Sequence, residues 1–187
     1  MNQQQQQIIQ WLNGDSYRMQ ALSIARKLGL SQWCLAAGFV RNLVWDQLHG
    51  HRAPTPLNDI DLVYFDEQNI SEQHDLQLEA QLQQHSFSQH PPFPWSVKNQ
   101  ARMHLRSGRL PYNSTEDAIS YWVEVETAIG ARLKENGDIE LVAPLGLDAL
   151  FTHTITLNAK NGDIDTYHQR INSKDWQRHW PELRLVV

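Results

Sequence analysis

The sequence has one cysteine, no long apolar run and no long basic run, and each of these features narrows what the protein can be. Cys34 is the only cysteine in 187 residues, so no intrachain disulfide can form and a reducing, cytoplasmic setting is expected. Its apolar neighbours favour a buried, inert thiol. No apolar stretch approaches the roughly 20 residues that a membrane-spanning helix needs, so we expect no membrane partner.

The charge balance gives no support to a large nucleic-acid interface. Sixteen lysines and arginines stand against 21 aspartates and glutamates, a net charge of −5, whereas proteins with extensive phosphate contacts are usually basic. The nine histidines are scattered without the close pairs or cysteine partners of a zinc site. The first residues lack the basic and apolar regions of a signal peptide, and the length fits one domain with a substantial core.

Two aspartates, Asp59 and Asp61, stand two apart in the apolar, β-prone run 57–65. Alternate side chains of a strand share a face, so these carboxylates are expected roughly 6.5–7 Å apart along the backbone. A divalent cation would offset their repulsion, and hard oxygen ligands suit Mg²⁺. The alternative is a solvated strand end with two exposed acids.

A strand, a glycine and a helix precede the acidic pair. Residues 33–37 read as a short buried strand, Gly38 follows, and apolar positions in 39–48 have helical spacing. A glycine at such a junction lets the backbone approach a ligand, and a helix N-terminus presents free N–H groups to an anion. Arg41 and Asn42, in the first turn, are placed to face the same anion. A simple tight turn and an exposed arginine are the alternatives.

The order strand, glycine, helix and hydrophobic-D-x-D-hydrophobic resembles the DNA polymerase β-like nucleotidyltransferase superfamily. Segments 95–104, 111–118, 127–133 and 143–148 further resemble a small bacterial family of uncharacterised nucleotidyltransferase-like proteins. The resemblance implies an α+β fold with a mixed sheet and helices packed on it. We expect a single domain over 1–187, with N-terminal helices in 1–30, a core in 31–150 and a C-terminal extension in 151–187.

The same resemblance implies transfer of a nucleoside monophosphate from an NTP to an acceptor hydroxyl on a small molecule, a protein or an RNA end. Asp59 and Asp61 would hold Mg²⁺, with Mn²⁺ as a substitute. Gly38 and the amides after it would take the phosphates, with Arg41 or Asn42 assisting.

A strand is predicted over Trp95–Leu105, which would place Lys98, Gln100, Arg102 and His104 on one face. If that face borders the aspartates, Lys98 is a candidate catalytic residue and Arg102 a candidate nucleotide-binding residue, both stabilising phosphate charge. Alternatively, they neutralise Asp59 and Asp61 as ion pairs.

The superfamily usually supplies a third carboxylate from a later strand, and 95–104 contains no acid. Ser96 or Asn99 stands where it is expected, and Glu124 or Glu126 would have to fold back to replace it. A catalytically weak nucleotide-binding or regulatory protein therefore stays an alternative. A metal-dependent phosphohydrolase is a third hypothesis, disfavoured because no His-Asp doublet with suitable placement is present.

The C-terminal part is predicted to be mainly helical. A helix is expected over 145–158, and the tail 167–180 is expected to dock its tryptophans, Trp176 and Trp180, on the core. Strands near 129–134 and 139–142 flank an Asn-Gly turn and predict a hairpin.

Overall fold

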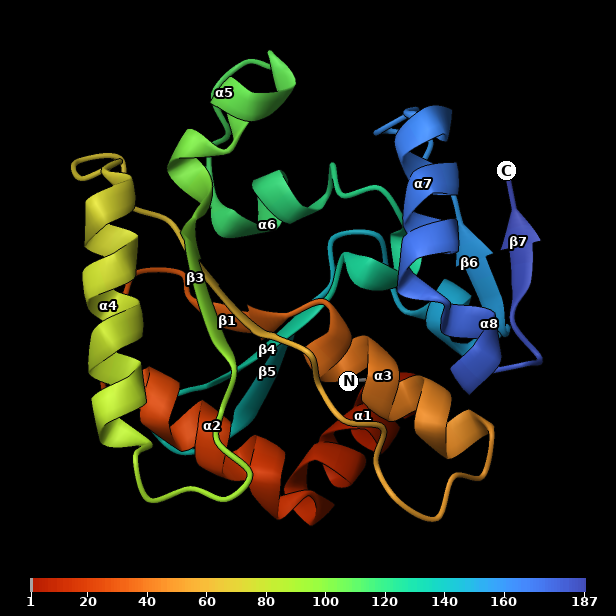
Figure 1. The fold of residues 1–187 in the computed structure, drawn as a ribbon, viewed down its shortest axis with the longest axis horizontal. Helices are drawn as coiled ribbons and strands as arrows, with labels where there is room; N and C mark the ends of the chain where they lie inside the picture. The colour runs from red at the N-terminus through yellow and green to blue at the C-terminus, as the bar shows by residue number, and fades with distance from the viewer. Residues whose placement is uncertain (1) are drawn as a thin grey trace.

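The computed structural model describes residues 2–187 and contains a five-stranded mixed sheet, a small two-stranded sheet and helices packed on both (Figure 1). This confirms the predicted α+β class. In chain order the elements are α1 (Gln3–Gly14), α2 (Ser16–Arg26), β1 (Cys34–Ala36), α3 (Gly38–Leu48), β2 (Ile60–Tyr64), α4 (Glu72–His85), β3 (Trp95–Asn99), η1 (Gln100–Arg102), α5 (His104–Ser107), α6 (Thr115–Ile119), η2 (Val125–Thr127), β4 (Gly130–Leu133), β5 (Ile139–Val142), η3 (Asp148–Phe151), β6 (Thr154–Thr156), α7 (Ile164–Lys174), α8 (Trp176–His179) and β7 (Arg184–Val186). Within these described residues, no helix is long and apolar enough to cross a membrane.

The strand order of the large sheet is β3-β2-β1-β4-β5. Strands β2 and β3 are parallel, and the other neighbours are antiparallel. The register places Asp61 opposite Ser96 of β3 and Ala36 of β1. It also pairs Val63 with Lys98. Because paired residues in adjacent strands point to the same face, Asp61, Ser96, Val63 and Lys98 lie together on one face of the sheet.

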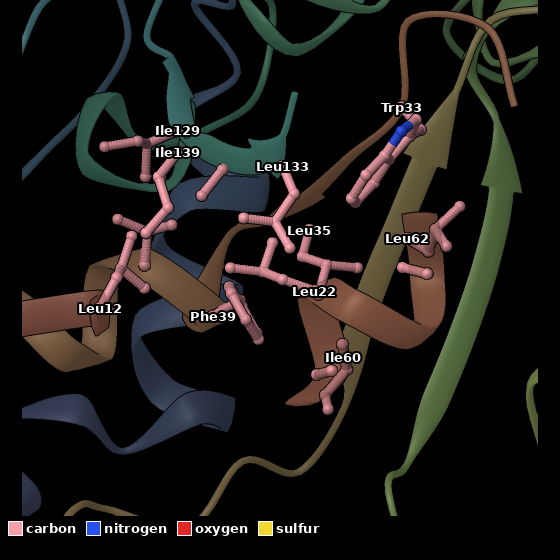
Figure 2. Packing of buried hydrophobic residues seen from close by; sticks show 14 of the residues in the cluster. Leu12, Leu22, Trp33, Leu35, Phe39, Ile60, Leu62, Ile129, Leu133 and Ile139 are labelled. Carbon is pink, nitrogen blue, oxygen red and sulfur yellow. The ribbon is translucent and has the colours of Figure 1, made fainter. Parts of the chain in front are cut away.

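The opposite face of the sheet carries the main core. Leu35 and Leu62 meet Leu12, Leu22 and Phe39 from α1, α2 and α3, and the labelled side chains converge between the helices and the strands (Figure 2). All five are at most 3% exposed, so the interior on this face is closed to water. The alternation along β2 therefore places Ile60, Leu62 and Tyr64 on this core face and Asp61 on the other.

The C-terminal segment packs on α3 through tryptophans. Trp176 and Trp180 lie edge-on to Trp45, with ring centroids 5.8 and 5.1 Å away. The Trp180 indole N–H also donates to Asp46 at 2.9 Å. The prediction that the tail docks its tryptophans on the core is confirmed.

Two predicted elements are wrong. The strand expected over 95–105 ends at Asn99, because the Asn99 side chain accepts from the N–H of Ala101 at 3.0 Å and starts a 3-10 turn. The helix expected over 145–158 is replaced by η3 and β6. Gly146 and His153 have φ of +78° and +52° there, and a right-handed helix cannot continue through such residues.

Candidate functional site

A cavity of about 490 Å³ lies on the polar face of the sheet. Its size is typical of small-molecule sites. It is lined by Ala37, Asp61, Val63, Ser96, Lys98, Gln100, Met103, Arg106, Ser107, Arg109, Tyr112, Ala118, Tyr121, Trp122, Val123, Thr127, Asn161 and Arg170. These residues come from β2, β3 and segments up to α7, so the C-terminal segment helps to close the site.

Asp61 is the acid of this cavity. Burial, and after it repulsion from Asp59, raises the pKa of its carboxyl to about 6. Hydrogen bonding from Ser96 and the charges of Lys174 and Arg41 act in the opposite direction. No ion pair to Asp61 forms within residues 2–187. A desolvated carboxylate beside a second one is the environment that a bound cation relieves.

Asp59 lies one residue before β2 and is exposed. It is therefore the end of the loop 49–59 and not a strand residue as predicted. Electrostatic repulsion from the Asp59 carboxylate nevertheless acts on Asp61 and contributes to its raised pKa. Asp61 lines the cavity and Asp59 does not.

The start of α3 lies beside the pair. Ala37, which lines the cavity, has φ +56° and ψ −123°, a conformation that favours glycine. Gly38 follows it with an ordinary backbone, and an added Cβ there would meet Asn42 at 3.4 Å, an ordinary contact. The sharp turn into the helix is thus made by the alanine, one residue earlier than the glycine suggests.

Arg41 and Asn42 are buried and bound to each other. The Arg41 guanidinium donates to the Asn42 side-chain oxygen at 2.9 Å and to the Thr127 hydroxyl at 2.7 Å. It also lies 4.9 and 4.6 Å from the ring centroids of Trp45 and Trp176. Burial lowers the pKa of Arg41 to about 10, so it stays charged at neutral pH. Arg41 supplies a fixed positive charge behind the helix start and does not line the cavity.

Lys98 and Arg102 have different surroundings and do not share a site. Lys98 lines the cavity, in register with Val63 beside Asp61. Arg102 belongs to η1, is 8% exposed and pairs with Asp75 of α4. The predicted common face for Lys98, Gln100, Arg102 and His104 is wrong, because the strand has already ended at Asn99. The partner of Arg102 is Asp75 and not either aspartate of the site.

Glu124 and Glu126, the candidates for a third carboxylate, are both hydrogen-bonded to other residues of the protein. Glu124 is fully buried and accepts two hydrogen bonds from Arg170, at 2.6 and 3.0 Å. Glu126 accepts from Thr154 and from the backbone and hydroxyl of Thr156 at 2.7–2.8 Å. Of the described residues, Asp61 is the one acid in the cavity lining.

Sequence reasoning missed the basic and aromatic part of the cavity. Arg106, Arg109 and Arg170 join Lys98 in the lining. The Arg109 guanidinium lies 4.7 Å from the ring centroid of Tyr121, which in turn packs against Tyr112 at 5.4 Å. Arg170 lies in the tail 167–180, and its spacing from the aspartates gives no signal of proximity. Only the tertiary packing of α7, where Arg170 pairs with Glu124, brings it there.

A mixed sheet with a carboxylate pair beside a strand-to-helix turn is the architecture of nucleotidyltransferases. A protein whose NMR structure is described as revealing a CCA-adding enzyme head domain is 34% identical, over 96% of this chain and 94% of that one, with a TM-score of 0.82. A CCA-adding enzyme solved with CTP matches 90% of this chain and 39% of its own, at 11% identity and a TM-score of 0.57. A tRNA-processing enzyme complex matches 88% and 42%, at 15% identity and a TM-score of 0.55. At such identities the last two show the fold alone.

The family model described as nucleotidyltransferase matches residues 23–185. The chain therefore belongs to this nucleotidyltransferase family, as the resemblance of its motifs predicted. No protein of curated function matches the sequence.

Proposed function

We propose that this protein is a metal-dependent nucleotidyltransferase that moves a nucleoside monophosphate from an NTP to an acceptor hydroxyl. The observation that carries the proposal is the charge distribution of one cavity. Four basic side chains, Lys98, Arg106, Arg109 and Arg170, line it together with a single acid, Asp61. Arg106 pairs with Glu72 and Arg170 with Glu124, so Lys98 and Arg109 are the two bases of the lining that have no acidic partner among residues 2–187. In a chain of net charge −5, two such bases in one cavity suit a triphosphate.

Asp59 and Asp61 are the residues that would hold Mg²⁺ or Mn²⁺. They fit such an ion because burial and mutual repulsion raise the pKa of Asp61, and a cation between the carboxylates would relieve the repulsion. When bound, the ion neutralises charge on the triphosphate.

The chain's own residues would bind and orient the nucleotide. The first amides of α3, after Ala37, would receive phosphate oxygens at the positive end of the helix. The buried charge of Arg41 strengthens the potential there. Lys98 would contact the phosphates next to Asp61. Asn42 would act through Arg41, and Arg102 has no part, since it pairs with Asp75 on the far face.

The aromatic end of the cavity would take the nucleobase. Tyr112 and Tyr121 pack at 5.4 Å, and Arg109 lies over Tyr121. Bases stack on such surfaces with little sequence preference. An RNA end is the acceptor to test first, because two similar structures are described as CCA-adding enzymes; a small molecule or a protein hydroxyl are the other classes.

One observation favours a second candidate, a nucleotide-binding protein with weak or no transfer activity. The cavity lining in residues 2–187 contains no second acid that could accept the proton of an acceptor hydroxyl. Glu124 and Glu126 are held by Arg170 and by two threonines. The two candidates share the nucleotide site and differ only in turnover.

The test is calorimetric titration of the full chain with CTP, ATP, GTP and UTP, with and without Mg²⁺. We expect Mg²⁺-dependent binding that weakens at least about tenfold in Asp61→Asn, the scale found when metal sites are perturbed. Glu67→Gln removes an exposed acid beyond the other end of β2 and is the matched control, expected to bind as the unchanged chain does.

Turnover is then measured with labelled NTP and RNA or small-molecule acceptors. Label transfer that Asp61→Asn abolishes supports the transferase. Mg²⁺-dependent binding without transfer to any acceptor supports the binding protein. Binding of no NTP would overturn both candidates.

A further inference from the structure

Three residues far apart in the sequence meet at the end of α3, outside the cavity. His49 caps the C-terminus of α3, His153 directly precedes β6, and Glu182 lies just before β7. One ligand atom of each lies within 4.8 Å of the others. Figure 1 shows the carboxyl end of α3 on the side of the molecule that carries β6, β7 and α8. The histidines, which look scattered in the sequence, form a close pair only in the fold.

His49 is oriented as metal-bound histidines are. Its Nδ1 lies 2.8 Å from the carbonyl oxygen of Trp45. A carbonyl can only accept, so Nδ1 carries the proton, and in the neutral ring Nε2 presents its lone pair. A backbone carbonyl on one ring nitrogen is the usual outer contact of a histidine that ligates through the other. Nε2 otherwise has a single long contact, from the N–H of Glu182 at 3.3 Å.

His153 supplies a buried nitrogen that lacks a partner. Its Nε2 is closed to solvent and has no hydrogen bond among the described residues. It lies 3.6 Å from the Glu182 carboxylate, and its ring centroid is 5.1 Å from that of His49. Its backbone has φ +52°, unusual for a residue other than glycine or asparagine. Buried polar atoms without a partner are rare in folded proteins and call for an explanation.

We propose that His49, His153 and Glu182 form a binding site for a divalent metal of the Zn²⁺ class. Two imidazoles and a carboxylate suit Zn²⁺, Co²⁺ or Ni²⁺, whereas Mg²⁺ prefers oxygen ligands throughout. Tetrahedral bonds of about 2.0–2.1 Å place ligand atoms roughly 3.3 Å apart, so the cluster must contract slightly. Glu182 is exposed and its side chain can make that movement. The metal would replace the 3.3 Å hydrogen bond that His49 Nε2 accepts from the backbone N–H of Glu182.

The metal would link the segment before β7 to the C-terminal end of α3, the helix whose N-terminus lies at the nucleotide cavity. His49 ends α3, and Glu182 immediately precedes the segment that pairs with β6. A metal here is separate from the ion at Asp59 and Asp61, because none of its three ligands lines that cavity. It would therefore hold the C-terminal segment in place and take no part in the transfer chemistry.

The test is calorimetric titration of the full chain, freed of metal with EDTA and desalted, with ZnCl₂. Visible absorption on adding Co²⁺ reports the coordination independently. We expect one Zn²⁺ per chain and a Tm that rises with Zn²⁺. His153→Asn removes the imidazole and keeps a residue that tolerates positive φ; it should weaken Zn²⁺ binding at least about tenfold. Glu182→Gln should weaken it as well.

Two variants serve as controls. His85→Asn changes an exposed histidine at the end of α4 and should leave Zn²⁺ affinity unchanged. Asp61→Asn should also leave it unchanged, which separates this site from the proposed nucleotide site. Absence of Zn²⁺ binding, or equal affinity in the unchanged chain and His153→Asn with both folded by circular dichroism, would overturn the proposal.

Discussion

Asp61 and Asp75 are two carboxylates on opposite faces of the same sheet, and their surroundings differ completely. Asp75, on α4, accepts from the Tyr64 hydroxyl at 2.7 Å and the Asn99 N–H at 3.1 Å, and it pairs with Arg102. Asp61 faces a cavity beside a second acid and has a raised pKa. The Asp75 carboxylate therefore has hydrogen-bond donors and a cation within the protein. The Asp61 carboxylate has no ion-pair partner among residues 2–187.

The difference separates structural acids from acids at a binding site. Three donors converge on Asp75, so the energy of removing its charge from water is recovered inside the fold. At Asp61, burial and repulsion from Asp59 destabilise the ionised carboxylate. The folded protein is therefore less stable when Asp61 is ionised. Uncompensated charge in a cavity is a common mark of a functional site.

The largest effect is expected from Asp75→Ala. The substitution leaves Arg102 buried without its partner and removes the acceptor of Tyr64. We expect the free energy of unfolding to fall by about 3–5 kcal/mol, as when one partner of a buried ion pair is deleted. Urea denaturation measures it, with Glu67→Ala as an exposed control. A loss below about 1 kcal/mol would mean that Asp75 is not the structural acid described.

A smaller loss is expected from Glu124→Gln. Glu124 is fully buried, but its partner Arg170 has a side chain 32% exposed, so the freed guanidinium can turn toward water in the cavity. We expect a loss of about 1–3 kcal/mol, the range for an imperfectly replaced buried hydrogen bond. The same urea titrations measure it. A loss as large as that of Asp75→Ala would place Glu124 and Arg170 among the fully buried pairs.

Asp61→Asn should stabilise the metal-free protein at neutral pH. A folded-state pKa raised to about 6 gives stability that is fully present below the unfolded pKa, near 4, and is lost as pH rises through about 6. The amide removes this loss, so we expect a gain of about 1–2 kcal/mol at pH 7.5, after allowance for solvent screening.

The gain from Asp61→Asn should vanish at pH 4, where the native carboxyl is protonated. Urea denaturation at pH 4, 6 and 7.5 without Mg²⁺ follows it. A variant less stable than the unchanged chain at pH 7.5 would show that the Asp61 charge is compensated inside the fold after all.

The smallest effect is expected from Ala37→Gly at the rim of the same cavity. Ala37 has φ +56° and ψ −123°, which costs an alanine about 1–3 kcal/mol and a glycine almost nothing. Glycine loses about 0.5–1 kcal/mol more in backbone entropy on folding. We expect a net gain near 1 kcal/mol by thermal denaturation. Ala131→Gly, in a regular strand of the core, should instead destabilise by about 1 kcal/mol.

The strands and the helix that carry the site could be predicted from the sequence, but the full set of residues that line the cavity could not. The strand before Gly38, the helix after it and the alternation around Asp61 are local patterns, and they led to the correct family. The extent of β3 was misjudged, because its end depends on the Asn99 side chain capping the next turn. The contributions of Arg109 and Arg170 to the cavity depend on long-range packing and leave no periodic signal.

What the sequence determined by itself is the acidic pair, the turn beside it and the α+β class, because strand and helix periodicity place neighbouring residues without reference to the rest of the chain. Only the tertiary structure decided which charges are compensated. Arg102 pairs with Asp75, and Arg170 pairs with Glu124 from a distant part of the chain. The packing of the helices on the sheet decides which charged residues lie close together. A buried charge then pairs with the opposite charge that this packing places beside it, because an unpaired buried charge is costly.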